Sequence, residues 1–267
     1  MLVYPNAKIN LGLHIVKKRE DGFHDIETVF YPIAISDVLE FVRAEESSFS
    51  SSGIEIPGAG DNLVMKALKL IQQDFKVDNL KVHLHKVIPI GAGLGGGSSD
   101  AAFMLKALRD YFKLPLNNEH LKKYAAQLGS DCSFFIDNQP SYAWGRGELM
   151  ETIPLWMKDY QLLLVYPNLH ISTAQAYSLA KPKVPVMNVK DIVQLPLEEW
   201  KDKLLNDFEV SAFQIYPELK TLKNQLYEMG AEYACMSGSG SSFFGIFKDR
   251  VGLPEEVKKY SNWWISL

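Results

Sequence analysis

A run of glycines that ends in two serines is the strongest chemical signal in the sequence. It reads PIGAGLGGGSS, and an amphipathic helix pattern follows it directly. Glycine allows backbone conformations with positive φ and lets the main chain approach a ligand closely, and free N–H groups at a helix N-terminus favour an anion. The stretch therefore predicts a phosphate cradle, with a flexible loop as the alternative. Its members are Pro89, Ile90, Gly91, Ala92, Gly93, Leu94, Gly95, Gly96, Gly97, Ser98 and Ser99.

Two familiar phosphate-binding motifs do not account for this glycine-rich loop. No lysine follows the glycines, so the stretch is not an ordinary P-loop. The spacing G-x-G-x-x-G occurs at Gly91, Gly93 and Gly96, but any dense glycine run contains it. Because no clear βαβ repeat follows, a dinucleotide-binding fold is the less favoured interpretation.

A second glycine-serine turn, SGSGSS at residues 237–242, lies between strand patterns around Tyr233 and Phe244. On its own, such a turn most often closes a hairpin. Its similarity to the first loop favours a second backbone turn that faces a ligand. We call it the second glycine loop, with Gly238, Ser239 and Gly240 at its centre.

The composition limits the classes of partner. The chain has 267 residues, of which 47% are hydrophobic and 22% charged, and this excludes a disordered protein. Its 32 acidic residues exceed its 28 basic ones, which argues against nucleic acid as a main partner. A small anion is still compatible with this balance, because a local site can differ from the net charge of -4.

The two cysteines, Cys132 and Cys235, lie far apart in the sequence and neither belongs to a C-x-x-C pair. This spacing excludes a disulfide framework and a cysteine-based zinc site. The first residues show no secretory signal, and no apolar run approaches the length of about 18 residues that a membrane helix requires. We therefore expect a cytoplasmic protein that does not bind a membrane.

Hydrophobic periodicity places strands and helices around the two loops. Strand patterns cover residues 11–16, 26–33, 82–87 and 161–166, and helix patterns cover 64–75, 98–112, 121–128 and 217–229. The segment 47–53 (SSFSSSG) is typical of a loop by composition. Strands and helices interleave without strict alternation, which favours an α+β fold. A composition break near Pro154 predicts two domains, residues 1–153 and 154–267.

Three ordered segments resemble the motifs of the GHMP kinases. These segments are PNAKINL at residues 5–11, PIGAGLGGGSSDAA at 89–102 and MSGSGSSFFGIF at 236–247. The resemblance implies a two-domain α+β GHMP kinase fold with the active site between the domains. The N-terminal domain would be ribosomal-protein-S5-like and nucleotide-binding, and the C-terminal domain would be ferredoxin-like and close over the substrate.

Three more segments narrow the resemblance. Residues 19–30 (REDGFHDIETVF), 128–132 (LGSDC) and 206–209 (NDFE) look like the branch of the family that acts in non-mevalonate isoprenoid precursor synthesis. This branch implies transfer of the ATP γ-phosphoryl group to the 2-hydroxyl of 4-diphosphocytidyl-2-C-methyl-D-erythritol. The implied partners are therefore two small molecules, ATP and a cytidine diphosphate sugar alcohol.

Two residues match the family's catalytic pair. By this resemblance, Asp131 accepts the hydroxyl proton as general base, and Lys8 holds the carboxylate ionised and stabilises charge on the acceptor oxygen. A loose transition state needs little proton removal beforehand, so an electrostatic role for Asp131 is the alternative.

The nucleotide side of the site raises two further questions. Lys86 lies three residues before the glycine-rich loop and could add a positive charge near the nucleotide, or it could lie on the surface. No compact acidic cluster suggests a dedicated metal site, so we expect Mg²⁺ to arrive with ATP, with Ser98 or Ser99 as a hydroxyl ligand. Asp100 stands where the family frequently has asparagine, and its effect stays open.

For the second substrate, the resemblance assigns Asn10, Phe23 and His24 to the cytidine and erythritol pockets. Phe23 offers a stacking face, where family members often have tyrosine, and His24 can form a hydrogen bond with the cytosine edge. Thr173 and Tyr177 are four residues apart on one face of a helix. They match a threonine and an aromatic residue that close the cytidine site, although ordinary packing is the alternative for Tyr177.

Two other functions fit part of this pattern. A GHMP kinase for another small alcohol, of the mevalonate or homoserine type, would share the three family motifs, but the Gly22-Phe23-His24 segment argues against it. A catalytically silent nucleotide-binding protein would share the fold, but the presence of both Lys8 and Asp131 argues against that.

Overall fold

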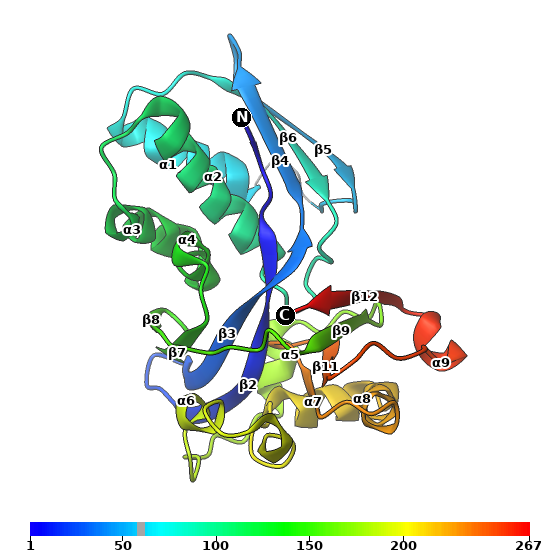
Figure 1. Ribbon diagram of the computed structural model, residues 1–267. Helices are drawn as coiled ribbons and strands as arrows, with labels where there is room; N and C mark the ends of the chain where they lie inside the picture. Colours follow the sequence, from blue (N-terminus) through cyan, green and yellow to red (C-terminus); the bar gives the residue numbers. More distant parts are fainter. Residues whose placement is uncertain (58–61) are drawn as a thin grey trace. The chain divides into compact units, whose positions relative to one another are not determined.

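The computed structural model describes residues 1–57 and 62–267, and the chain divides into two compact units (Figure 1). Each unit draws on several segments. The first unit comprises Met1–Ala7, Ile35–Ile90 and Gly95–Gln139, and the second comprises Lys8–Ala34, Gly91–Leu94 and Pro140–Leu267. Neither unit is one continuous segment of the chain. The domain boundary predicted between residues 153 and 154 therefore stays a prediction.

A four-stranded sheet forms one layer of the first unit. Its strand order is β1-β4-β6-β5, with β4 antiparallel to both β1 and β6, and with β5 parallel to β6. Alternating positions of β4 and β6 are buried, as expected for strands with one face on the core. The strands span Leu2–Val3 (β1), Val38–Arg43 (β4), Leu80–Lys86 (β6) and Ser48–Gly53 (β5).

Helices cover this sheet on one face. Asn62 caps α1 (Leu63–Asp74) by accepting a hydrogen bond from Val64 N, and the buried residues of α1 repeat at helical spacing. Figure 1 shows α1 beside α2 (Gly96–Phe112), the helix that the glycine-rich loop opens. The remaining helices of the unit are α3 (Asn118–Leu128), the 3₁₀ helix η2 (Ser130–Cys132) and α4 (Phe134–Asp137).

The loop predicted at residues 47–53 is wrong, because Ser48–Gly53 forms the edge strand β5. Serines in this segment are exposed, and their hydroxyls contact histidines on the neighbouring strand, as in the 2.9 Å contacts of Ser52 with His83 and His85. An edge strand needs no apolar side chains, because its backbone supplies the pairing. Composition alone therefore missed it.

The second unit contains an antiparallel sheet of order β10-β11-β9-β12. Its apolar face packs against α5, α7 and α8, and the two longer helices lie along the sheet in Figure 1. The elements span Tyr233–Met236 (β10), Phe243–Phe247 (β11), Gln161–Tyr166 (β9), Ser261–Ser266 (β12), Thr173–Ser178 (α5), Phe208–Ile215 (α7) and Glu218–Glu228 (α8). Sheets that helices cover on one face confirm the predicted α+β class.

A second sheet has the order β2-β3-β7-β8. Two long strands, β2 (Asn6–Lys18) and β3 (His24–Ser36), contribute most of it, with β7 (Ser141–Gly145) and β8 (Leu149–Thr152) beside them. Short helices α6 (Val189–Ile192), η3 (Leu197–Glu199) and α9 (Glu255–Lys258) complete the described elements.

Three smaller features complete the description of the fold. Cys132 and Cys235 are both free and buried, which confirms the absence of a disulfide between them. Trp264 packs against Phe247 with ring centroids 5.2 Å apart, so the C-terminal tryptophan is a packing residue. In the described ranges, 1–57 and 62–267, no helix has the length and apolar character needed to cross a bilayer.

Candidate active site

Strand β2 carries Lys8 into the interior of the second unit, where the residue is only 4% exposed. Its ammonium group donates to Asn10 Oδ1 at 2.5 Å and to the carbonyl oxygen of Gly93 at 3.2 Å. The ammonium also lies 4.9 Å from the ring centroid of Phe30. Lys8 is therefore held as a cation against the glycine-rich loop, and it is not a solvated N-terminal lysine.

Asn10 orients this lysine. Its side-chain oxygen accepts from Lys8, its amide nitrogen donates to Thr28 Oγ1 at 3.0 Å, and its backbone N–H donates to Ser237 Oγ at 3.1 Å. Asn10 is 2% exposed, so its side-chain amide forms these hydrogen bonds in the protein interior. Its predicted contact with the second substrate stays a prediction, while its contact with Lys8 is a feature of the structure.

The second glycine loop packs against Gly93 of the glycine-rich loop. Ser237 Oγ donates to the Gly93 carbonyl oxygen at 2.8 Å, and Ser242 N donates to Ala92 O at 3.2 Å. The two loops, which resemble each other in sequence, are therefore hydrogen-bonded to each other within the second unit.

The side chain of Asn206 holds the second glycine loop through two hydrogen bonds. Its side-chain nitrogen donates to Met236 O at 2.8 Å and to Gly238 O at 2.9 Å. Next to it, Asp207 Oδ2 accepts from Ile15 N on β2 at 2.7 Å. The NDFE segment was identified only by resemblance, and these hydrogen bonds give it a supporting role in the structure.

In the first unit, the glycine-rich loop ends at the N-terminus of α2. Gly95 precedes the helix with φ +68°, and no side chain caps the first turn. The helix has 17 residues, and its first-turn N–H groups together with its dipole favour an anion at this end. Gly91 and Gly93 also have positive φ, so the loop needs glycine where the motif places it.

The two serines of the loop differ in exposure. Ser98 is half-buried, whereas Ser99 is fully buried and its Oγ has no hydrogen-bond partner in the described part of the chain. The described residues contain no group of three or more histidine, cysteine, aspartate or glutamate side chains that could hold a metal. This donor set is compatible with a Mg²⁺ ion bound mainly by phosphate and water.

Lys86 is buried at 3% exposure, so the alternative of a surface lysine is wrong. Its ammonium donates to Asp37 Oδ2 at 2.5 Å and to Asp100 Oδ2 at 2.8 Å. Burial raises the pKa of Asp100 to about 8, with Asp37 adding to the rise and Lys86 opposing it. Sequence reasoning missed Asp37, because no motif contains it.

Asp131 lies in η2 and is half-buried. The turn packs on the start of α2, because an ideal Cβ at Gly129 would lie 4.0 Å from Ser98 Oγ, and the side chains of Cys132 and Ser98 are hydrogen-bonded. Burial raises the pKa of Cys132 to about 11, and the charge of Asp131 contributes. The structure thus places Asp131 close to the end of the glycine-rich loop in the first unit. Lys8 belongs to the second unit.

An aromatic cluster in the second unit contains two of the predicted substrate residues. The rings of His24 and Tyr177 stack with centroids 4.6 Å apart, and Tyr177 meets Phe208 edge-on at 4.7 Å. Burial and, secondly, the charge of Lys18 lower the pKa of His24, which favours the neutral ring. The structure brings together His24 from β3 and Tyr177 from α5, residues 153 positions apart in the sequence.

The other two predicted substrate residues are more exposed. Phe23 is 55% exposed, and the guanidinium of Arg146 lies 5.0 Å from its ring centroid. Thr173, at the start of α5, is also exposed. Both side chains are accessible to a ligand, and sequence reasoning did not include Arg146.

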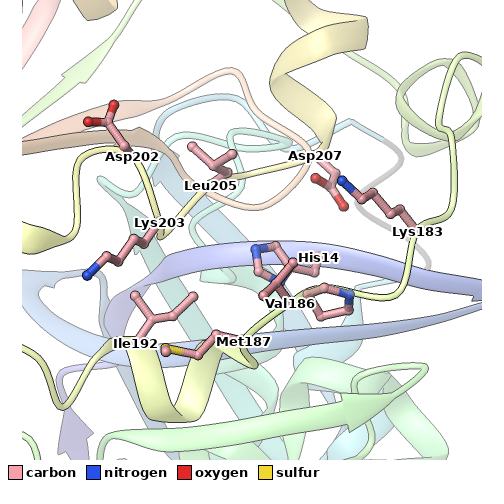
Figure 2. Close-up of a pocket in the computed structure, with 10 residues that line it drawn as sticks. His14, Lys183, Val186, Met187, Ile192, Asp202, Lys203, Leu205 and Asp207 are labelled. Carbon is pink, nitrogen blue, oxygen red and sulfur yellow. The ribbon is translucent and has the colours of Figure 1, made fainter.

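A pocket of about 420 Å³ lies in the second unit. His14 of β2 is among the side chains that line it (Figure 2). His14 Nδ1 is 3.0 Å from Glu27 Oε1, and apolar residues such as Met187 and Ile192 form much of the wall. None of the predicted site residues lines this pocket. Of the supporting residues described above, Asp207 lines it.

Two family models match segments of this chain. Residues 62–146 match the family described as GHMP kinases N terminal domain, and residues 189–265 match GHMP kinases C terminal. A 4-diphosphocytidyl-2-C-methyl-D-erythritol kinase from Parabacteroides distasonis is 47% identical over 257 residues, which cover 96% of this chain and 95% of the relative. The protein of the same name from Bacteroides thetaiotaomicron is 48% identical over 260 residues, with the same coverage of both chains.

Solved structures agree with these relatives. The crystal structure of a 4-(cytidine 5'-diphospho)-2C-methyl-D-erythritol kinase superposes with a TM-score of 0.83 at 30% identity and covers 99% of this chain and 98% of its own. The mevalonate kinase of Methanococcus jannaschii superposes with a TM-score of 0.69 at 13% identity and covers 100% of this chain and 98% of its own. The second likeness shows a shared fold alone.

Proposed function

Because the chain belongs to the 4-diphosphocytidyl-2-C-methyl-D-erythritol kinases of the GHMP kinase family, we propose that it transfers the γ-phosphoryl group of ATP to the 2-hydroxyl of 4-diphosphocytidyl-2-C-methyl-D-erythritol. It is a phosphotransferase with an alcohol as acceptor. This step belongs to the non-mevalonate synthesis of isoprenoid precursors. The cytoplasmic location stays a prediction.

In the proposed reaction, the acceptor oxygen forms a bond to the γ-phosphorus while the bond from that phosphorus to the bridging oxygen of ADP breaks. The hydroxyl proton passes to Asp131. Lys8 stabilises the negative charge on the transferred group and on the acceptor oxygen. Phosphoryl transfer requires positioning and charge neutralisation more than covalent participation by the protein.

The glycine-rich loop supplies N–H donors to the triphosphate, and the N-terminus of α2 adds its dipole. Mg²⁺ arriving with ATP would be held by the hydroxyl of Ser98 or Ser99, and it would neutralise phosphate charge. The partly exposed Ser98 is the more accessible of the two. His24 and Tyr177 provide a polar edge and a stacking face for the cytosine base, with Phe23 and Thr173 beside it.

The observation that carries this proposal is the 3.2 Å hydrogen bond from Lys8 Nζ to the Gly93 carbonyl oxygen. It places a buried cation on the backbone of the loop that carries the family's phosphate-binding motif. A solvated lysine would not form this hydrogen bond. A protein that only binds the nucleotide would not require a buried lysine at this position.

The test is an ATP-consumption assay with three alcohols: the cytidyl diphosphate compound, mevalonate and homoserine. We expect turnover with the first alone. Turnover with mevalonate or homoserine but not with the cytidyl compound would overturn the proposed substrate assignment. ATP binding without turnover of any alcohol would favour the silent nucleotide-binding protein.

A further inference from the structure

Lys86 ends strand β6 and points into a closed cluster of charges. The side chains of Lys86, Asp37 and Asp100 are 3%, 0% and 3% exposed. One ammonium group faces two carboxyl groups, at 2.5 Å and 2.8 Å. The positive charge is therefore engaged inside the first unit and is not presented to a ligand in solvent.

Asp37 connects this cluster to the entrance of the glycine-rich loop. Its second oxygen, Oδ1, accepts hydrogen bonds from Val87 N at 2.6 Å and from Ile88 N at 2.8 Å. These two residues lead from β6 into the loop. A single carboxylate thus holds Lys86 and the backbone at which the loop begins.

Asp100 connects the cluster to the exit of the loop, because it lies in the first two turns of α2. The helix start also rests directly on the lysine. An ideal Cβ at Gly96 would lie 2.8 Å from Lys86 Nζ and 2.9 Å from Ile88 Cγ2. A larger residue at Gly96 would therefore displace either the ammonium group or the helix.

We propose that Asp37, Lys86 and Asp100 form a clamp that fixes the entrance and the exit of the glycine-rich loop relative to each other, and that Lys86 is a positioning residue rather than a ligand of the nucleotide. The inference rests on the proposed function, because it concerns the ATP side of that site. Binding a triphosphate through backbone donors requires those donors to be held in place before the ligand arrives. A loosened clamp weakens ATP binding and leaves the chemistry of bound ATP largely unchanged.

The decisive variants change Asp100. Asp100→Ala removes the acceptor on α2, and we expect the KM for ATP and the Kd of a fluorescent ATP analogue to rise by about tenfold, with kcat changed by less than about twofold. Asp100→Asn keeps an oxygen that can accept from Lys86, and we expect both constants to return to within about twofold of the wild type. Asp110→Asn, on the exposed face of the same helix, is the matched control.

Lys86→Met tests the second half of the proposal. It leaves two carboxyl groups buried without their cation, so we expect a lower midpoint of thermal unfolding. Should this variant fail to fold, the two Asp100 variants decide the question alone. Should it fold, its Kd for the ATP analogue will rise no more than about tenfold, as for Asp100→Ala.

Three results would overturn the clamp. The first is a folded Asp100→Ala protein with wild-type KM and Kd for the nucleotide. The second is Asp100→Asn behaving like Asp100→Ala, since charge rather than the hydrogen bond would then matter. The third is loss of ATP binding in folded Lys86→Met while Asp100→Ala binds normally, which would make Lys86 a direct ligand. Failure of the proposed function is a separate result, in which the wild type binds the analogue but does not phosphorylate the cytidyl alcohol.

Discussion

Ser237 Oγ donates a hydrogen bond of 2.8 Å to the carbonyl oxygen of Gly93, and this bond joins the second glycine loop to the glycine-rich loop. The backbones are in close contact here, because an ideal Cβ at Gly93 would lie 1.9 Å from Ser237 O. Gly93 also has φ +79°, a conformation that other residues rarely adopt. Both sterics and backbone conformation therefore require glycine at this position.

The first prediction follows from this contact. Gly93→Ala should lower the free energy of unfolding by about 3 kcal/mol or more, because it combines a backbone clash with a strained φ. It should also weaken binding of a fluorescent ATP analogue, since the loop must move away from its place beside Lys8. Thermal unfolding and titration with the analogue measure the two effects.

Gly252→Ala is the matched control, because no atom lies within 4 Å of the Cβ that it would add. We expect it to unfold and bind nucleotide like the wild type. Identical behaviour of the two alanine variants would contradict the role given to Gly93.

Local motifs marked most residues of the candidate site, but not their contacts. Lys8 and Gly93 were each marked by a motif, yet the hydrogen bond between them joins residues 85 positions apart. Lys86 could be read as a nucleotide contact or as a surface residue. Its partner Asp37 is 49 positions away and belongs to no motif. Such pairings depend on the tertiary fold, and one sequence without its fold does not contain them.

Secondary structure was predictable where apolar side chains form a continuous run or repeat with the helical period. Strand β9 and helix α8 match their predicted positions closely, because β9 is an apolar run buried on both faces and α8 has one buried apolar face. Strand β5 was missed because its pairing is a backbone property of an exposed edge. Hydrophobic periodicity reports burial, and an edge strand of serines has almost none.

The second prediction concerns the ring stack of His24 and Tyr177. Tyr177→Leu removes the aromatic face and should raise the KM for the cytidyl substrate by about 5- to 150-fold, the range that corresponds to a loss of roughly 1–3 kcal/mol of base stacking. The KM for ATP should not change. Steady-state kinetics with each substrate varied in turn measures both constants.

Trp156→Leu is the control for this variant, since Trp156 is an aromatic residue of the same unit with 76% exposure. It should have no effect on either KM. A Tyr177→Leu enzyme with wild-type KM for the cytidyl substrate would assign Tyr177 to packing alone.

The third prediction is a pH dependence that belongs to His24. Burial and the charge of Lys18 lower its pKa from the ordinary 6.5, so the ring stays neutral through pH 7 and gains a proton only in more acidic solution. We expect the KM for the cytidyl substrate to be constant from about pH 8 to 6.5 and to rise below that range. In His24→Gln, which does not titrate, this acidic rise should disappear. The same rise in both enzymes would place the titrating group elsewhere.

The fourth prediction concerns Cys235, which is fully buried on β10. Burial raises the pKa of its thiol from 9.0 to about 12, and the nearby Glu209 adds to the rise. The folded state therefore keeps a proton that the unfolded state loses above pH 9. Stability should be independent of this thiol below pH 9 and should decrease between about pH 9 and 12, by up to about 1.4 kcal/mol per pH unit.

Urea unfolding of wild type and Cys235→Ala across this pH range isolates the contribution of the thiol. In the native protein at pH 8, Cys235 should also resist a thiol reagent such as dithionitrobenzoate until urea unfolds the chain. Rapid labelling of Cys235 in native conditions would contradict the burial on which both expectations rest.

The final prediction tests the proposed catalytic pair, Asp131 and Lys8. Asp131→Asn removes the base and its charge, so kcat should fall by about 10²–10⁴-fold, while the Kd of an ATP analogue stays within about twofold because the glycine-rich loop provides nucleotide binding. Lys8→Met should also lower kcat, through loss of charge stabilisation. Asp137→Asn, in nearby α4, is the control aspartate because its half-buried side chain pairs with Lys122. A fall in kcat at constant Kd would assign Asp131 to the chemical step, and unchanged turnover would remove it from the mechanism.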